Sequence, residues 1–228
     1  MNKTKYIKTG VWRIENKYAL LPAEFEQLKC QFSAVLPVDR GQSYSVSSLY
    51  FDDYFDSFLQ DTINGQPVRE KFRVRIYDDS LSVIKLEHKK KQYSRICKDF
   101  EYLNEDELKR LVTGQMITKN DGVSALYNAA LLTRHLKPKV IAKYKRTAFV
   151  YEGGKVRITF DENLEASQDV LSFGSDRLKY DFVQDAFRVV EVKYTQFLPN
   201  FIANLLDCGN MWQSANSKYR ICRELCDE

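Results

Sequence analysis

Charged side chains recur at every second position in five separate segments of this 228-residue chain. Between Lys71 and Tyr77, Lys, Arg and Arg alternate with Phe, Val and Ile. Because successive side chains of a β-strand point to opposite faces, this period of two places the charges of each segment on one face. The other four segments are 12–20, 83–91, 155–161 and 188–194. The pattern predicts antiparallel strands with one charged face and one apolar face.

The whole chain contains about eight strand segments, the alternating ones included, which is enough to close a barrel. They lie near residues 12–20, 44–52, 70–78, 82–90, 93–101, 138–151, 155–162 and 187–195. Apolar residues at helical spacing predict helices over 22–34, from Asn104 onward, over 122–136 and over 199–206. We therefore expect an α+β fold: an eight-stranded antiparallel β-barrel tunnel with helices packed outside, formed by a single domain over residues 1–228.

The types of charge indicate what such a tunnel would hold. A sheet with one solvated face is the ordinary explanation of alternation, but a solvated face mixes more residue types than the Arg, Lys and single Glu found here. Burying many cations without a counterion is too costly, so the tunnel must contain water or an anion. The predicted basic lining is Arg13, Lys17, Arg73, Arg75, Lys85, Lys89, Arg146, Arg157 and Lys193, with Glu15, Glu87 and Glu191 as its acidic members. Excess cation suits a row of phosphates, and a few carboxylates suit Mg²⁺ or Mn²⁺.

Several other classes of protein are disfavoured by composition. Two histidines leave almost nothing for a histidine zinc site or a Ser-His-Asp triad. The five cysteines form no CxxC pair, which fits a reducing compartment, and we expect a cytoplasmic protein. No apolar run is long enough for a membrane segment, and the start of the sequence lacks the apolar stretch of a secretory signal. The charged faces carry few aromatic residues for base stacking, so we expect no nucleic-acid partner.

A few further residues have blander explanations. His88 faces away from the charged set, and we expect a structural or surface role for it. Cys222 and Cys226 have helical spacing and should pack rather than bind a metal, and Asp52 and Asp53 should be turn residues. The run 89–91 is also compatible with a hairpin turn that leaves Lys89 alone pointing inward.

Eight sequence pieces occur in an order that resembles a known family. They are RIENKY, SSLYFDD, KFRVRIY, IKLEHKK, KPKVIAKYKRTAF, VRITFD, VVEVKY followed by LP, and SKY. From Arg13 to Tyr219 the chain resembles the VTC domain, the polyphosphate polymerase domain of the vacuolar transporter chaperone type, within the triphosphate tunnel metalloenzyme superfamily. Single pieces are weak signals, whereas eight in order are specific.

The resemblance implies metal-dependent transfer, with Mn²⁺ or Mg²⁺, of the γ-phosphate of ATP onto a growing inorganic polyphosphate chain, or onto pyrophosphate. Arg73 and Arg75 look like the paired arginines on the nucleotide phosphates, and Glu191 looks like the metal-binding glutamate. The implied catalytic set is Arg73, Arg75, Lys89, Arg146 and Arg157. The implied substrate-binding set is Arg13, Lys17, Lys85, Lys98, Tyr144, Lys193, Ser217 and Lys218, and the metal set is Glu191, Glu15 and Glu87.

Two alternatives to the polymerase remain open at this point. One is an inorganic triphosphatase or polyphosphatase of the same fold, and the other is a non-catalytic polyphosphate-binding module. Hydrolases of the superfamily begin with Glu-x-Glu-x-Lys, whereas this chain has Arg13, Glu15 and Lys17. One carboxylate is thus replaced by a cation, which favours binding more phosphate over a second metal. The sequence does not identify a membrane partner protein.

Overall fold

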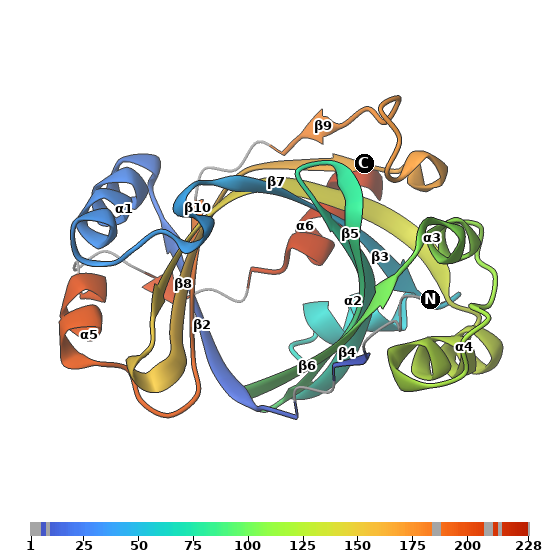
Figure 1. Ribbon diagram of the computed structural model, residues 1–228, viewed down its shortest axis with the longest axis horizontal. Coiled ribbons are helices and arrows are strands. Elements are labelled where there is room, and N and C mark those ends of the chain that lie inside the picture. The colour runs from blue at the N-terminus through green and yellow to red at the C-terminus, as the bar shows by residue number, and fades with distance from the viewer. Residues whose placement is uncertain (1–5, 8–9, 184–187, 208–211, 214–215, 228) are drawn as a thin grey trace.

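Eight antiparallel strands close into a barrel in the computed structural model, which describes residues 6–7, 10–183, 188–207, 212–213 and 216–227. Around the ring each strand pairs with the next, and the last returns to the first (Figure 1). In ring order the strands are β2 (Arg13–Leu20), β6 (Arg95–Leu103), β5 (Ser80–Gln92), β4 (Val68–Tyr77), β3 (Tyr44–Asp52), β7 (Lys137–Tyr151), β8 (Val156–Ser167) and β10 (Arg188–Tyr194). The fold class predicted from the alternation is therefore confirmed. The predicted start of the last strand at 187 lies outside the described residues.

The pairings between neighbouring strands of the barrel differ greatly in length. Strands β7 and β8 pair along most of their length, from Ile141 opposite Ser167 to Tyr151 opposite Val156. The closing contact between β2 and β6 consists of two pairs only, Arg13 opposite Ile96 and Ile14 opposite Arg95, among the described residues. Three two-residue strands, β1 (Tyr6–Ile7), β9 (Asp181–Phe182) and β11 (Trp212–Gln213), pair antiparallel with β6, β8 and β2 respectively. The barrel is thus closed, with one short seam.

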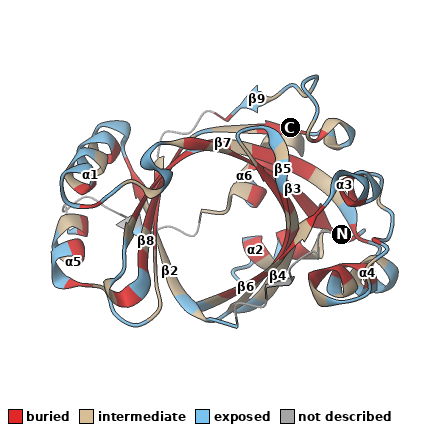
Figure 2. Ribbon diagram, viewed as in Figure 1, coloured by how far each residue is buried: buried red, intermediate tan, exposed pale blue. Residues whose placement is uncertain are grey.

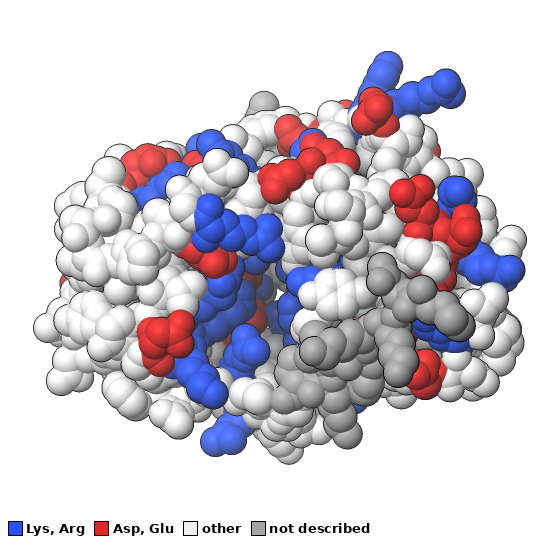
Figure 3. Space-filling view, viewed as in Figure 1, with Lys and Arg blue, Asp and Glu red and all other residues white. Residues whose placement is uncertain are grey.

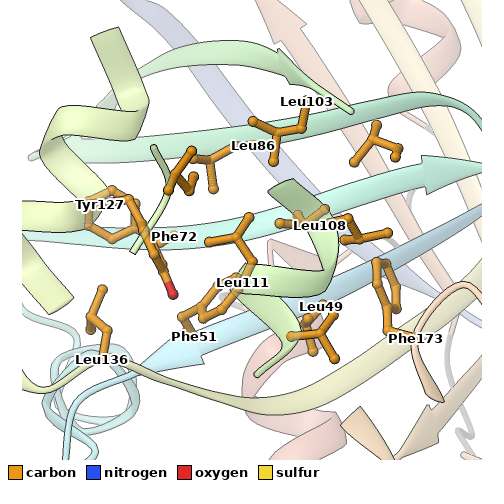
Figure 4. Close-up of a cluster of buried hydrophobic side chains, with 14 of the residues drawn as sticks. Leu49, Phe51, Phe72, Leu86, Leu103, Leu108, Leu111, Tyr127, Leu136 and Phe173 are labelled. Carbon is orange, nitrogen blue, oxygen red and sulfur yellow. The ribbon is translucent and has the colours of Figure 1, made fainter. Parts of the chain in front are cut away.

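Helices cover the apolar outer faces of the strands in two groups (Figures 1 and 2). On one side α3 (Glu105–Val112) and α4 (Gly122–Arg134) pack on β4 and β5, where Tyr127 lies edge-on to Phe51 and Leu111 is fully buried (Figure 4). On the other side α1 (Pro22–Val35) and α5 (Asn200–Leu206) cover β8 and β10. These four are the predicted helices. The start of α3 is fixed as expected by two reciprocal hydrogen bonds. The Asn104 side chain accepts from the Glu107 backbone amide, and the Glu107 side chain accepts from the Asn104 backbone amide.

Two further helices gather at one end of the barrel. Helix α2 (Ser57–Ile63) follows β3, and α6 (Lys218–Asp227) lies within the outline of the ring in Figure 1. Tyr219 and Cys222 of α6 pack against a buried cluster of Tyr50, Leu59, Val140, Ala142 and Ala166. This packing aims the first residues of α6 at the interior of the barrel.

The structural role expected for His88 agrees with the described structure, whereas Asp52 is the last residue of β3 and fully buried, and is not a turn residue. His88 is buried, stacks on the Phe72 ring and bonds Glu70 through Nε2 at 2.6 Å. Asp52 and Asp53 accept hydrogen bonds from backbone amides that begin α2. No described helix combines the length and the apolar character needed to cross a membrane.

Candidate functional site

The interior of the barrel is a cavity of ≈ 810 Å³ with a strongly basic wall. Among the described residues, fifteen Lys and Arg side chains line it against four Asp and Glu side chains. Figure 3 shows the blue cations gathered in the central hollow, while the outer surface mixes both signs. A net charge this positive in one enclosure requires anions, and phosphate is the anion that Arg and Lys bind best.

The cavity brings together fifteen of the sixteen site residues predicted from the sequence. They are Arg13, Glu15, Lys17, Arg73, Arg75, Lys85, Lys89, Lys98, Tyr144, Arg146, Arg157, Glu191, Lys193, Ser217 and Lys218. Tyr144 points inward as expected. Glu87 alone does not line the cavity, since it is 0% exposed behind the cations that do.

Two arginines on β4 form the centre of the wall. Arg73 binds Glu87 through Nε and Nη2, both at 2.7 Å from Oε2, and donates to the Tyr50 hydroxyl at 3.1 Å. Arg75 donates to the Tyr144 hydroxyl at 3.0 Å. Burial opposes the charge of Glu87, but Arg73, Lys98 and Arg75 hold its pKa well below the usual range. These contacts favour a role for Glu87 in fixing Arg73 and Lys98 over a role in binding metal.

A second unit joins β7, β8 and α6. Arg146 donates to Asp161 through Nε and Nη2, at 2.6 and 2.7 Å, and Lys218 Nζ donates to the same carboxylate at 2.6 Å. Burial raises the pKa of Asp161, but Arg146 and Lys218 outweigh it and lower the pKa to about 2. Asp161 therefore stays ionised and holds two cations from distant parts of the chain side by side.

Glu15 and Glu191 form the one pair of cavity carboxylates on neighbouring ring strands, β2 and β10, among the described residues. Lys17 Nζ lies 3.9 Å from Glu15 and 3.3 Å from Glu191, while Lys89 lies 2.9 Å from Glu15 and Lys193 lies 2.5 Å from Glu191. Burial opposes ionisation, yet Lys89 and its neighbours lower the pKa of Glu15 to about 2. For Glu191, Lys193 and Lys17 overcome burial in the same way, so its pKa is well below the usual range.

The resemblance implies a divalent cation, for which Glu15 and Glu191 are the candidate ligands. Over the described part of the chain, no group of three or more His, Cys, Asp and Glu residues is arranged to hold a metal ion. Two ionised carboxylates nevertheless fit a hard cation that keeps several waters and takes its remaining ligands from substrate phosphates. Glu15 and Glu191 fit that kind of site, and a cation enclosed by protein ligands does not fit.

At another part of the wall, cations rest on aromatic rings. The Arg40 guanidinium lies over the Tyr44 and Tyr77 rings at 4.6 and 4.9 Å, and Lys85 lies within 5.3 Å of three ring centroids. Arg157 bonds the Tyr44 hydroxyl at 3.1 Å and Asp39 at 2.5 Å. Ring faces stabilise these cations without neutralising them.

Sequence reasoning missed several members of the site. Asp161 and Lys71 were visible as members of charged alternations, but neither was given a role. Arg69 has the same parity as Lys71 on its strand, and it too lines the cavity. The hairpin-turn alternative for the run 89–91 is wrong: β5 continues to Gln92, and Lys91 lines the cavity together with Lys89. Arg40 sits in a short helical turn, Asp39–Gly41, which no alternation could reveal.

Comparisons with known proteins agree with this architecture. The family model of the VTC domain matches residues 12–226. A protein from Bacillus halodurans described as a candidate adenylate cyclase superimposes with a TM-score of 0.53 at 13% identity, covering 85% of each chain. The PH1819 protein from Pyrococcus horikoshii superimposes with a TM-score of 0.51 at 14% identity, covering 93% of this chain and 99% of its own. At such identities the likeness shows a shared fold alone. No curated protein sequence matched the chain.

Proposed function

Since the chain belongs to the VTC domain family, we propose that it is a polyphosphate polymerase, which transfers the γ-phosphate of ATP onto a growing inorganic polyphosphate chain inside the barrel. The observation that carries the proposal is the cavity wall, in which fifteen cations face four carboxylates among the residues that the structure describes. We extend the proposal to the whole chain, residues 1–228, as one domain.

Phosphoryl transfer onto a polyphosphate chain does not require a strong general base. A terminal oxygen of the acceptor chain is already an anion, so it attacks the γ-phosphorus directly while the bond to the β–γ bridging oxygen breaks and ADP leaves. Positioning and charge neutralisation then supply the catalysis. Arg73 and Arg75 bind the nucleotide phosphates, because their guanidiniums are already oriented by Glu87, Tyr50 and Tyr144.

The remaining predicted residues complete the site around this centre. Lys89, Arg146 and Arg157 neutralise charge on the transferred group, and Arg146 is oriented for this by Asp161. The other cavity cations and Ser217 bind the nucleotide and the acceptor chain. Glu191 and Glu15 would hold Mn²⁺ or Mg²⁺, which would offset the negative charge of the substrate phosphates.

The test is incubation of the purified chain with ATP and Mn²⁺ or Mg²⁺, with polymer length and free phosphate measured in the same reaction. Polymer together with ADP supports the proposal. Phosphate release from inorganic triphosphate without any polymer would identify a triphosphatase or polyphosphatase instead. Tight polyphosphate binding with neither product would identify a binding module. Arg13 is the residue that favours the polymerase, since it adds a cation where the hydrolases carry a carboxylate.

A further inference from the structure

Three aromatic side chains outside the cavity are displayed to solvent. Tyr54 and Phe55 lie between β3 and α2 and are 71% and 80% exposed, and Tyr93 lies at the tip of the β5–β6 hairpin and is 74% exposed. We call these three residues the aromatic tips. None of them lines the cavity, so the proposed phosphoryl transfer gives them no role. Large apolar side chains exposed together commonly mark a surface that binds something else.

The strand pairings bring the aromatic tips to the same end of the barrel. The β3–α2 loop follows the end of β3, and the hairpin tip follows the end of β5. Strand β4 lies between β3 and β5 in the ring, and it begins at this end with Val68, which is itself exposed and pairs with Gln92. The Tyr93 amide donates to the Pro67 carbonyl at 2.8 Å, next to Val68. The two loops therefore flank the start of β4.

The loop that carries Tyr54 and Phe55 is held in place by its acidic residues. The Asp53 carboxylate accepts hydrogen bonds from the backbone amides of Phe55 and Ser57, at 3.1 and 2.9 Å. Asp56 has a left-handed backbone with a φ of 54°, a conformation that persists in a non-glycine residue only where its surroundings fix it. Here Arg223 binds the Asp56 carboxylate at 2.8 and 3.1 Å. A loop fixed in this way loses little conformational entropy when its aromatic side chains bind.

The same end of the barrel is positively charged. The hairpin segment 89–98 contains five Lys and Arg residues and no Asp or Glu. Arg95 in this hairpin and Lys137 at the start of β7 are both exposed, and neither lines the cavity. Over the described part of the chain, no carboxylate oxygen lies within 4.0 Å of Arg95 or Lys137. The acidic residues of the β3–α2 loop are bound to cations of their own, so they leave these two charges available.

This arrangement fits a lipid surface better than a protein partner. The aromatic residues that dominate protein interfaces cluster in one packed centre. The aromatic tips stand on two separate loops, with the exposed polar residues Gln66 and Gln92 near them. A bilayer interface accommodates separate side chains, because aromatic rings settle among the lipid headgroups. Anionic lipids add attraction to nearby Lys and Arg side chains, and the two effects together determine how tightly a protein binds to the surface of a membrane.

We propose that this end of the barrel docks on the surface of an anionic lipid bilayer. Tyr54, Phe55 and Tyr93 insert among the headgroups, and Arg95 and Lys137 face the anionic lipids. The chain lies on the bilayer in this arrangement and does not cross it. Docking uses no residue of the cavity, so it goes beyond the proposed polymerase function and can be measured without ATP.

The first experiment measures co-sedimentation of the purified chain with vesicles of phosphatidylcholine and phosphatidylglycerol. Phe55→Ser/Tyr93→Ser should bind them on the order of tenfold more weakly than the unmodified chain, because two apolar tips are lost. Phe55→Leu/Tyr93→Phe keeps the tips apolar and should bind normally. Phe197→Ser is the matched control, because Phe197 is also exposed but follows β10 at the opposite end of the barrel. It should bind like the unmodified chain.

The second experiment tests the charges. Arg95→Gln/Lys137→Gln should weaken binding to the same vesicles on the order of tenfold, and Arg95→Lys/Lys137→Arg should not. Arg177→Gln/Lys179→Gln is the matched control for net charge. It removes two exposed cations close to Gly174, which lies against Leu81 at the opposite end of β5. Vesicles of phosphatidylcholine alone should bind every one of these proteins more weakly than the anionic vesicles bind the unmodified chain.

A fluorescence measurement detects insertion directly. In Phe55→Trp, the emission of the new indole should shift to shorter wavelength on anionic vesicles, and lipids brominated on their acyl chains should quench it. In Phe197→Trp the emission should do neither. The signal of the unmodified chain, which contains Trp12 and Trp212, is subtracted in both cases. An unchanged emission of Phe55→Trp at saturating vesicle concentration would overturn the proposal.

A folding measurement separates docking from damage to the protein. Because the replaced side chains are exposed, Phe55→Ser/Tyr93→Ser should melt within about 2 °C of the unmodified chain. Vesicle binding that is the same in this variant, or that falls equally in the two matched controls, would overturn the proposal. Absence of vesicle binding together with binding of poly(U) that the Ser variant loses would overturn it in favour of nucleic acid. Polymer formation from ATP decides none of these outcomes.

Discussion

Two hydroxyl groups accept hydrogen bonds from the Arg75 guanidinium, that of Ser48 at 3.2 Å and that of Tyr144 at 3.0 Å. A lysine has one ammonium group and cannot keep both contacts while binding phosphate. Arg75→Lys should therefore lower kcat about 100-fold, or ~2.7 kcal/mol, and change nucleotide affinity far less. Steady-state kinetics of polymer formation checks this, with the exposed Arg177→Lys as control. Unmodified rates and melting temperatures in both Arg73→Lys and Arg75→Lys would contradict the assignment of the tunnel itself.

Glu191→Gln keeps the size and polarity of the side chain but removes the charge that a hard cation needs. Turnover should fall strongly, nucleotide binding should weaken only in part, and the fold should remain intact. The measurement is activity against Mn²⁺ concentration, with Glu224→Gln, whose ion pair with Arg220 is on the surface, as the matched control. Full activity at equal metal concentration would remove Glu191 from the mechanism.

Lys98 titrates near neutrality. Burial lowers its pKa to about 7, Arg75 and Arg73 act in the same direction, and Glu87 offsets part of the effect. The ammonium is charged below that pKa and neutral above it, so triphosphate should bind with proton uptake at about pH 8 and with little at about pH 6. In Lys98→Arg this uptake should disappear, because arginine stays charged. Calorimetry in buffers of different ionisation enthalpy measures the proton number, and identical values in both proteins would refute the role of Lys98.

At the scale of elements, α6 is attached to the barrel through a chain of polar contacts. The Tyr219 hydroxyl donates to Asp52 and accepts from Arg223, which binds Asp56 at 2.8 and 3.1 Å. Asp52 in turn accepts hydrogen bonds from the backbone amides of Phe58 and Leu59. One network therefore orients both helices at this end, and it presents Ser217 and Lys218 to the cavity.

Tyr219→Phe should break this network while leaving the ring packing in place. Asp52 then loses a donor in a buried position, which costs about 1–2 kcal/mol or roughly 2–8 °C in melting temperature for a chain of this size. Burial already raises the pKa of Asp52, and the lost hydrogen bond should raise it further. Thermal unfolding provides the measurement, with the exposed Tyr93→Phe as control. A melting temperature equal to that of the control would show that the hydroxyl does not hold α6.

Over the whole molecule, a barrel full of cations should be stabilised by the anion it binds. At a concentration 100 times its Kd, a ligand that binds only the folded state adds about 2.7 kcal/mol. Inorganic triphosphate should therefore raise the melting temperature by roughly 5–11 °C, and sulfate at equal ionic strength should raise it much less. Differential scanning calorimetry tests this, and equal shifts for both anions would indicate screening without a site.

The sequence contained most of the barrel because its strands obey a local rule. Inward and outward residues alternate, so strands such as Arg13–Leu20 could be placed nearly to the residue. The helix α2 was not predictable in this way, since its seven residues begin after Asp56 in a left-handed conformation and depend on the Asp52 and Asp53 side chains. Partnerships between elements, such as those of Asp161 on β8 with Arg146 on β7 and with Lys218 on α6, depend on register and closure. Parity along one strand fixes neither.

The seam between β2 and β6 is the shortest described junction of the barrel. In the described parts of the chain two residue pairs close it, whereas every other junction of the eight strands is longer. Local opening follows the path with the fewest backbone hydrogen bonds to break, so amide protons on this edge of β2 should exchange with solvent sooner than those buried between β7 and β8. A linear polyphosphate can enter a closed barrel by its end. A cyclic polyphosphate can be threaded through the barrel only while the seam between β2 and β6 is open. Local opening of this one junction would then decide whether the barrel admits cyclic polyphosphates as well as linear ones.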